Sequence, residues 1–167
     1  MTNEGRGAPS TRRHGERSAA RLAAVQALYQ IDISGIGADD VTDEFLRHRL
    51  GDAGDDASVP AADTGLFSEL VHGVCARGDE IDPMISRALG GGWTLDRLEL
   101  LLRAVLRAGA FELLARADVP APVVIDEYIE VARAFFGRGE PGLVNGVLDR
   151  LAHELRPAEL VARKGAS

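Results

Sequence analysis

The sequence has little cysteine, little lysine and no long apolar run. Cys75 is the only cysteine among 167 residues, which excludes an intrachain disulfide and a cysteine-rich zinc site. No stretch approaches the roughly 18 uncharged apolar residues that a membrane-spanning helix needs. The first residues also lack the apolar segment of a secretion signal, so a reducing cytoplasm is the expected location.

Positive charge is scarce and unevenly placed. The chain has 26 acidic and 19 basic residues, a net charge of −7 and a pI of about 5.1, which argues against a protein that binds polyanions over its whole surface. Residues 1–21 nevertheless carry +3, which leaves −10 for the other 146 residues. Lys164 is the only lysine, so nearly all positive charge is arginine, the residue best suited to bidentate phosphate contacts. A basic N-terminal segment on an acidic body predicts a local contact with a polyanion.

Apolar residues recur at three- and four-residue spacing along most of the chain, and no segment alternates as a strand would. This pattern predicts an all-α fold of about seven helices in two packed helical sub-bundles. We expect a single domain at 17–157, with sub-bundles at roughly 17–90 and 93–157. A flexible arginine-containing arm at 1–16 precedes it, and a flexible tail at 158–167 follows it.

Helix boundaries follow from capping residues and glycines. Thr42 and Thr94 are the expected N-caps of the second and fifth helices, and Gly90–Gly92 ends the fourth and marks the seam between the sub-bundles. The acidic segment at 51–63 has no apolar periodicity and predicts a loop, to which we assign no function. The expected helices cover 17–33, 42–50, 63–77, 80–89, 95–116, 122–136 and 143–155.

Several motifs that could carry chemistry favour a structural interpretation. The G-x-G-x-x-G match at 137–142 follows a helical pattern rather than a strand, so it predicts a turn and not a dinucleotide site. Cys75 lies among apolar residues and is interpreted as a small core residue. Asp126, Glu127 and Glu130 are interpreted as carboxylates on a solvated helix face. With no nucleophile paired to a base, we expect no catalytic residue, no cofactor and no metal ion.

The N-terminal arginines form a more specific pattern. Arg13, Arg17 and Arg21 are spaced by four residues, so they form one stripe if the first helix extends backwards. Gln26 and Tyr29 follow one to two turns further on. Arginines that hold phosphates, followed by an amide and an aromatic ring, are typical of single-stranded RNA recognition. The residues alone leave open the alternative of a solvated tail followed by a core tyrosine.

Short segments in the right order make the chain resemble the NusB family of bacterial transcription antitermination factors. The segments are RLAAVQALY at 21–29, WTLDRL at 93–98, AVLR at 104–107, FELL at 111–114, VP at 119–120, VIDE at 124–127, Ala132 and VNGVLD at 144–149. Each is weak alone, and together they span roughly residues 17–155.

The resemblance implies a non-enzymatic function as well as a fold of two helical sub-bundles. It implies binding of the boxA element of nascent RNA together with NusE, a small-subunit ribosomal protein. The complex then acts on RNA polymerase with other Nus factors, so that ribosomal RNA operons are read through terminators. The implied RNA-binding residues, with two arginines added from the arm, are Arg12, Arg13, Arg17, Arg21, Gln26, Tyr29, Asn145 and Gly146. The sequence leaves open whether the protein is a monomer or a homodimer, and which surface binds NusE.

The chain departs from the family pattern at a few positions. Ser18 and Ala19 stand where further basic residues are common, Leu143 where phenylalanine is usual, and Leu102 where an acidic residue is common. These departures suggest weaker or altered RNA contacts on the same fold. Two alternative functions are an accessory RNA-binding domain of a ribosomal RNA methyltransferase system and a helical adaptor that binds only protein.

Overall fold

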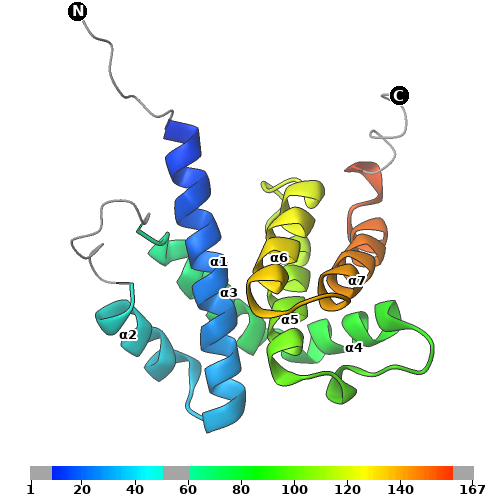
Figure 1. Ribbon diagram of the computed structural model, residues 1–167, viewed down its shortest axis with the longest axis horizontal. Helices are drawn as coiled ribbons and strands as arrows, with labels where there is room; N and C mark the ends of the chain where they lie inside the picture. The colour runs from blue at the N-terminus through cyan, green and yellow to red at the C-terminus, as the bar shows by residue number, and fades with distance from the viewer. Residues whose placement is uncertain (1–8, 51–60, 160–167) are drawn as a thin grey trace, which may run out of the picture.

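The computed structural model describes residues 9–50 and 61–159, and this part of the chain is helical and contains no strand. The predicted all-α class is confirmed (Figure 1). The tail beyond residue 159 and most of the acidic 51–63 segment lie outside the described residues. The helices are α1 (Pro9–Ser34), α2 (Ala38–His48), α3 (Thr64–Ala76), α4 (Gly78–Leu89), the 3₁₀ turn η1 (Leu95–Arg97), α5 (Leu100–Ala115), α6 (Ala121–Phe135) and α7 (Glu140–Leu155). None of these helices has the length and apolarity needed to cross a bilayer.

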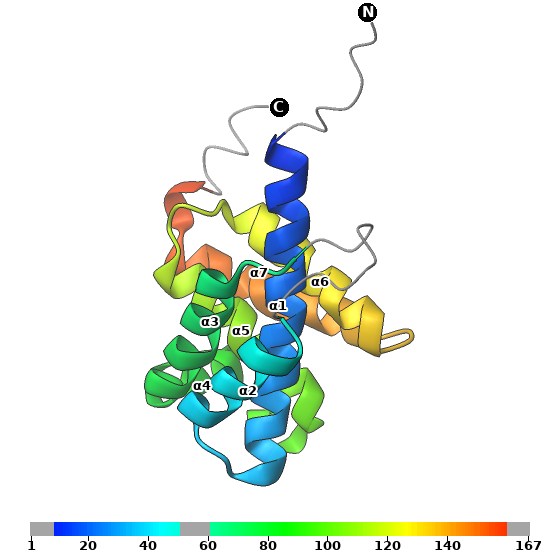
Figure 2. The same ribbon diagram turned by 90° about the vertical axis from the view of Figure 1, so that its left-hand side faces the viewer.

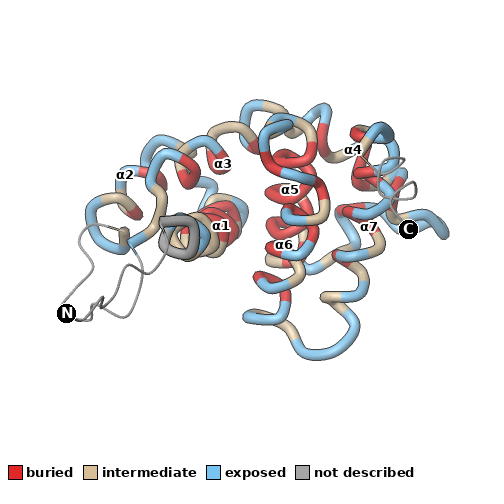
Figure 3. Tube along the Cα trace, turned by 90° about the horizontal axis from the view of Figure 1, so that it is seen from above, coloured by how far each residue is buried: buried red, intermediate tan, exposed pale blue. Residues whose placement is uncertain are grey.

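Helix α5 lies at the centre of the fold. It packs against α1 and α3 on one side and against α4, α6 and α7 on the other. Most of its residues are buried around the whole helix, as the red tube in Figure 3 shows. A helix that is apolar all round needs neighbours on every face, and α5 has them. One continuous apolar core results, to which all seven α-helices contribute.

The helices do not divide at the glycine run as expected. Helix α4 packs on α5 and α7 more extensively than on α3, which directly precedes it in the chain. Gly90, Gly91 and Gly92 all have positive φ angles and end α4, as predicted. They therefore connect two parts of the group that contains α5, α6 and α7, while α1, α2 and α3 form the other group.

Helices α1 and α2 begin at least one full turn earlier than the sequence predicted. Helix α1 begins at Pro9 instead of Arg17, with the proline in its first turn, so residues 9–16 are helical. Helix α2 begins at Ala38, which places Thr42 inside the helix. The prediction that Thr42 caps this helix is therefore wrong. Its side chain is buried, and its hydroxyl has no hydrogen-bond partner among the described residues.

The long helix predicted at 95–116 is interrupted near its start. Leu98 is extended, with φ −84° and ψ 152°, and separates η1 from α5. Arg103 holds this break, because its Nε donates to the Leu98 carbonyl at 2.7 Å. Thr94 makes no capping hydrogen bond, whereas Asp63, near which the third helix was expected to start, caps α3 by accepting from the Leu66 amide at 3.0 Å.

Arg156 closes the far end of the central helix from within the fold. It is only 8% exposed, and its guanidinium donates to the carbonyls of Leu113 at 2.9 Å, Glu112 at 3.0 Å and Arg116 at 2.6 Å. It also donates to the Val119 carbonyl. The last carbonyls of a helix lack partners within the helix and carry partial negative charge. Arg156 supplies both the hydrogen bonds and the positive charge that this end of α5 requires.

Candidate nucleic-acid interface

The first turns of α1 extend beyond the rest of the bundle, as Figure 2 shows. Arg13 is exposed, Arg17 is half-buried and Arg21 is 1% exposed. This gradient follows from helix geometry, because each step of four residues rotates a side chain by about 40° around the axis. The three arginines thus form a stripe that turns from solvent into the contact of α1 with α5 and α6. Arg12 belongs to α1, but its side chain lies outside the described residues.

Arg21 is engaged inside the protein. Its Nε donates to Glu112 Oε1 at 2.6 Å, and its Nη2 donates to Glu112 Oε2 at 3.1 Å. The Tyr128 hydroxyl donates to the same Glu112 Oε1 at 2.7 Å. Burial raises the pKa of Tyr128 well above 10, and the neighbouring Glu112 carboxylate raises it further. Burial lowers the pKa of Arg21, but the bonds and charge of Glu112 outweigh this effect and raise it overall.

Glu127 extends this network, and its interpretation as a solvated carboxylate is wrong. It is 7% exposed and lies 3.5 Å from Arg21 Nη1. The Ser18 hydroxyl donates to Glu127 Oε2 at 2.8 Å, and His14 Nε2 lies 3.2 Å from Glu127 Oε1. No local pattern indicates this burial, since the partners of Glu127 are more than 100 positions away along the chain. We call Arg21, Glu112, Glu127 and Tyr128 the buried arginine cluster.

Gln26 and Tyr29 lie together on the wall of a pocket of about 370 Å³. The pocket lies where α1, the end of α2, the start of α5 and the end of α6 meet. We call it the aromatic pocket. Its lining residues are Gln26, Tyr29, Gln30, Ile33, Arg49, Leu101 and Phe135. Two aromatic rings, two amides and one guanidinium around an open hollow provide surfaces for stacking and groups for hydrogen bonding to a nucleobase.

The sequence did not identify Arg49 or Phe135 as part of this site. Arg49 follows α2, and its guanidinium lies 4.4 Å from the centre of the Phe45 ring. Such a cation–π contact orients the guanidinium while leaving its other face available. Ile33 adds an exposed apolar side chain, 57% accessible, at the pocket rim. Only the fold brings Arg49 and Phe135 to Tyr29, because they belong to other helical segments, whereas Ile33 is one turn further along α1.

The arginine stripe and the aromatic pocket are separate along α1. Twelve residues separate Arg17 from Tyr29, which corresponds to about 18 Å along the axis and about 120° around it. A ligand that touches both must therefore be extended and must cross the helix. A polynucleotide strand has that form.

Asn145 and Gly146 lie on a different helix from the arginine stripe and from Tyr29. Both belong to α7, which packs on α4, α5 and α6. Asn145 is exposed, whereas Leu143, two residues earlier in α7, is half-buried against the core. Leu102 is buried in α5. Neither Asn145 nor Gly146 lines the pocket that contains Gln26 and Tyr29.

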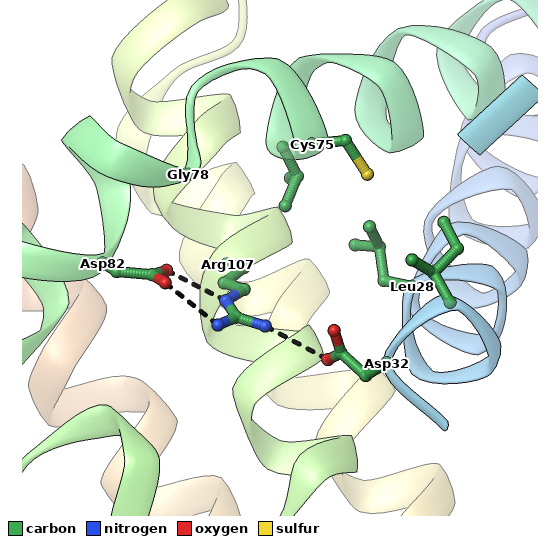
Figure 4. A pocket seen from close by; sticks show the side chains of 8 residues that line it. Leu28, Asp32, Cys75, Gly78, Asp82 and Arg107 are labelled. Carbon is green, nitrogen blue, oxygen red and sulfur yellow. Dashed lines mark hydrogen bonds and ion pairs between the residues drawn. The ribbon is translucent and has the colours of Figure 1, made fainter. Parts of the chain in front are cut away.

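The close-up in Figure 4 shows a second pocket, of about 160 Å³, beside Cys75 and Arg107. Arg107 donates to both carboxylate oxygens of Asp82, at 2.9 and 3.0 Å, and to Asp32 at 3.1 Å, which ties α5 to α4 and α1.

Cys75 lies at the surface, so its interpretation as a core residue is wrong. Burial of the sulfur and the nearby Asp32 raise the pKa of the Cys75 thiol, which makes it a weak nucleophile.

The helix–helix turn predicted at 137–142 exists but is shorter, because residues 140–142 already belong to α7. Helix α6 ends at Phe135 and α7 begins at Glu140, with Gly139 at φ 102° between them. A residue with a side chain rarely adopts that φ, which explains a glycine here.

The described residues contain no cluster of three or more histidine, cysteine, aspartate or glutamate side chains able to hold a metal ion.

Comparison with known proteins identifies the family. Residues 18–153 match the NusB family. This chain belongs to the NusB family. The transcription antitermination protein NusB of Rhizobium etli (strain ATCC 51251 / DSM 11541 / JCM 21823 / NBRC 15573 / CFN 42) is 52% identical over 141 residues, which cover 84% of this chain and 88% of that protein. T. maritima NusB has the same fold, with a TM-score of 0.71 and 32% identity over 86% of this chain and 96% of that one.

A third NusB-like fold occurs in a structure of the antitermination factors NusB and NusE in complex with double-stranded RNA. Its TM-score is 0.69 at 22% identity, over 82% of this chain and 96% of that chain. The resemblance found in the sequence is therefore confirmed, and the chain stands among transcription antitermination factors rather than enzymes. Because the NusB relative matches over most of its own length, an accessory domain of a methyltransferase system is not favoured.

Proposed function

We propose that this protein binds boxA-containing single-stranded RNA together with NusE and promotes read-through of ribosomal RNA operons. The observation that carries the proposal is the aromatic pocket, which brings Phe135 and Arg49 to Gln26 and Tyr29 of α1, the helix that bears the arginine stripe. Other Nus factors and RNA polymerase are then indirect partners.

In this proposal the exposed arginines of α1 hold phosphates. Arg13 and Arg17 are accessible, and Arg12 precedes them on the same helix. Phosphate contacts fix the position of the strand without reading its sequence. With about three such contacts, affinity is modest. The logarithm of the binding constant falls linearly with the logarithm of the salt concentration, by roughly 0.7 per phosphate contact, and we call this dependence the salt slope. Arg21 does not contact phosphate, because its guanidinium is buried against Glu112.

Base recognition belongs to the aromatic pocket. Tyr29 and Phe135 offer ring faces on which an unpaired base can stack, and Gln26 offers both a donor and an acceptor. Each stacked base contributes about 1–3 kcal/mol. Asn145 and Gly146 lie on α7, so we propose that they act at a separate contact along the RNA or its partner.

NusE supplies the remaining affinity. Two modest surfaces that hold one RNA raise their combined affinity through effective concentration, without any new contact within either protein. The solved assembly of the antitermination factors NusB and NusE with double-stranded RNA contains a chain of this fold, which supports NusE and RNA as partners. Whether a homodimer forms in the absence of RNA is a separate question that gel filtration with light scattering answers.

The proposal is tested by fluorescence anisotropy with a labelled boxA RNA and a scrambled RNA of equal length, with and without NusE, at two salt concentrations. We expect tighter binding of boxA RNA than of the scrambled RNA, and a further increase in affinity when NusE is added. Equal binding of both RNAs that disappears at moderate salt would contradict the proposal and indicate a nonspecific basic segment on a helical adaptor.

A further inference from the structure

We propose that Arg21 is a positioning residue, which fixes the orientation of the first half of α1 through Glu112 and so presents the outer arginines to RNA. The inference rests on the proposed function for its RNA readout. It assigns Arg21 a role different from that of Arg17, although the two arginines are one helical turn apart.

The geometry of the contact supports a role in orientation. The guanidinium donates two parallel hydrogen bonds to the two oxygens of Glu112, at 2.6 and 3.1 Å. A bidentate pair of this kind constrains both the distance and the rotation of its two helices. Glu112 belongs to the central helix α5 and is itself 0% exposed. It therefore provides a fixed reference against which α1 is set.

A third helix holds the reference carboxylate in place. The Tyr128 hydroxyl of α6 donates to Glu112 Oε1 at 2.7 Å, and Tyr128 is fully buried. On the same helix, Glu127 accepts from Ser18 and lies beside His14, one and two turns before Arg21 on α1. The cluster therefore ties residues 14–21 of α1 to α5 and α6 together.

The charges of the cluster explain why Arg21 cannot also bind a phosphate. One guanidinium faces two carboxylates, Glu112 and Glu127, at 2.6 and 3.5 Å. Moving Arg21 out to solvent would leave two buried negative charges without their main partner, which is strongly unfavourable. Among the described residues no contact joins Arg13 or Arg17 to a buried carboxylate, so the stripe divides into residues that hold RNA and one that holds α1.

The test exchanges the buried charge pair for a neutral pair. Arg21→Met alone leaves the Glu112 carboxylate without its cation, whereas Arg21→Met with Glu112→Gln removes that ion pair and keeps an acceptor for Tyr128, and Glu127 keeps Ser18 and His14 beside it. Arg17→Met is the matched control, because it removes an arginine from the accessible part of the same helix. RNA affinity is measured by anisotropy with boxA RNA over a range of salt, at a temperature where each variant is folded. Hydrogen exchange of residues 13–20 is measured without RNA.

The positioning role predicts that Arg21→Met weakens RNA binding about tenfold and speeds hydrogen exchange in residues 13–20, while the salt slope stays the same. In the double variant no unpaired Glu112 charge keeps α1 from packing on α5, so affinity returns to within about threefold and exchange slows again, although the arginine is absent and the helix is held less tightly than by the bidentate pair. Arg17→Met lowers the magnitude of the salt slope by about 0.7, as loss of one phosphate contact requires, and adding Glu112→Gln does not restore its affinity.

Two results would overturn the inference. A smaller salt slope in both Arg21 variants, without recovery in the double variant, would mean that Arg21 binds phosphate directly. Unchanged RNA affinity and unchanged exchange in Arg21→Met, with only a lower unfolding temperature, would mean that Arg21 merely stabilises the fold. If the unaltered protein does not prefer boxA RNA, the proposed function fails, and the exchange data still decide whether Arg21 orients α1. If Arg21→Met alone does not fold, the double variant decides the question.

Discussion

Two arginines of this protein lie inside the fold and bind groups from distant parts of the chain. Arg21 meets Glu112 across 91 positions, and Arg156 meets the Leu113 carbonyl across 43. A buried arginine is tolerated only when its donors are satisfied, and both of these are. Neither burial was predictable from sequence, because an arginine in an amphipathic helix has the same local pattern whether its partner is a phosphate or a distant glutamate.

Arg156→Ala tests how much the end of α5 depends on its capping arginine. We expect the substitution to lower the free energy of unfolding by about 3 kcal/mol, because several buried carbonyls lose a charged donor at once. Urea unfolding followed by circular dichroism measures the change. Arg138→Ala is the control, since Arg138 is exposed in the turn before α7 and its loss is expected to change stability by under about 0.5 kcal/mol. Equal effects of the two substitutions would contradict the assignment.

Tyr128 makes stability depend on pH in the alkaline range. Its pKa in the folded protein is well above 10, because burial and Glu112 oppose ionisation, whereas the unfolded chain ionises near pH 10. The contribution of this group is therefore complete below about pH 10 and is lost as pH rises further, by at most about 1.4 kcal/mol per pH unit. Urea unfolding at pH 9 and pH 11 measures it. Tyr128→Phe is expected to lessen this pH dependence, and an unaltered dependence would refute the assignment.

At the scale of the helices, the apolar periodicity of the sequence predicted which segments are helical. It did not predict how the helices pack against one another. All seven predicted helices exist, because a three- to four-residue spacing of apolar side chains requires a buried face. The predicted helix boundaries were wrong where a residue's type or spacing is compatible with two different positions in the structure. Thr42 has the side chain of a cap but lies buried inside α2, and Leu98 has the spacing of a helix but is extended. The central place of α5 follows from packing, which no local pattern encodes.

Part of the contact between α2 and α3 is expected to depend on pH. His72 of α3 bonds Asp39 through Nε2 at 2.7 Å and the Ser68 carbonyl through Nδ1 at 2.9 Å. Both partners are acceptors, so both ring nitrogens must carry hydrogen, and the protonated ring fits best. The hydrogen bond to Asp39, and then the one to Ser68, raise the pKa of His72, while Asp43 adds a smaller effect in the same direction.

Because the folded-state pKa is the higher one, this stabilisation is present below about pH 6.5 and is lost as pH rises through the folded value. The pair is largely exposed, so the expected change is under about 1 kcal/mol. Asp39→Asn is expected to reduce it. Nuclear magnetic resonance titration of the His72 ring in both proteins checks this, and an identical midpoint in the two would contradict it.

At the scale of the whole molecule, charge placement restricts where RNA can bind. The chain carries −7 overall, while its first 21 residues carry +3. The structure places the described arginines of that segment on a helix that extends beyond the bundle, with the aromatic pocket further along the same helix (Figure 2). The sequence predicted the pairing of arginines with Gln26 and Tyr29. It could not predict Phe135 and Arg49, which only the packing of α6 and α2 against α1 brings to the pocket.

The most direct test of this account compares Arg17→Gln with Tyr29→Leu in their affinity for boxA and scrambled RNA over a range of salt. Arg17→Gln is expected to weaken both RNAs equally and to lower the salt slope by about 0.7. Tyr29→Leu keeps an apolar side chain but removes a stacking ring. It is therefore expected to weaken binding of boxA RNA about tenfold and binding of the scrambled RNA much less, and to leave both salt slopes unchanged. Two results would contradict the account: Tyr29→Leu weakens binding of boxA and scrambled RNA equally, as Arg17→Gln does, or neither substitution weakens binding of either RNA. In both cases α1 is not the surface that reads the RNA sequence.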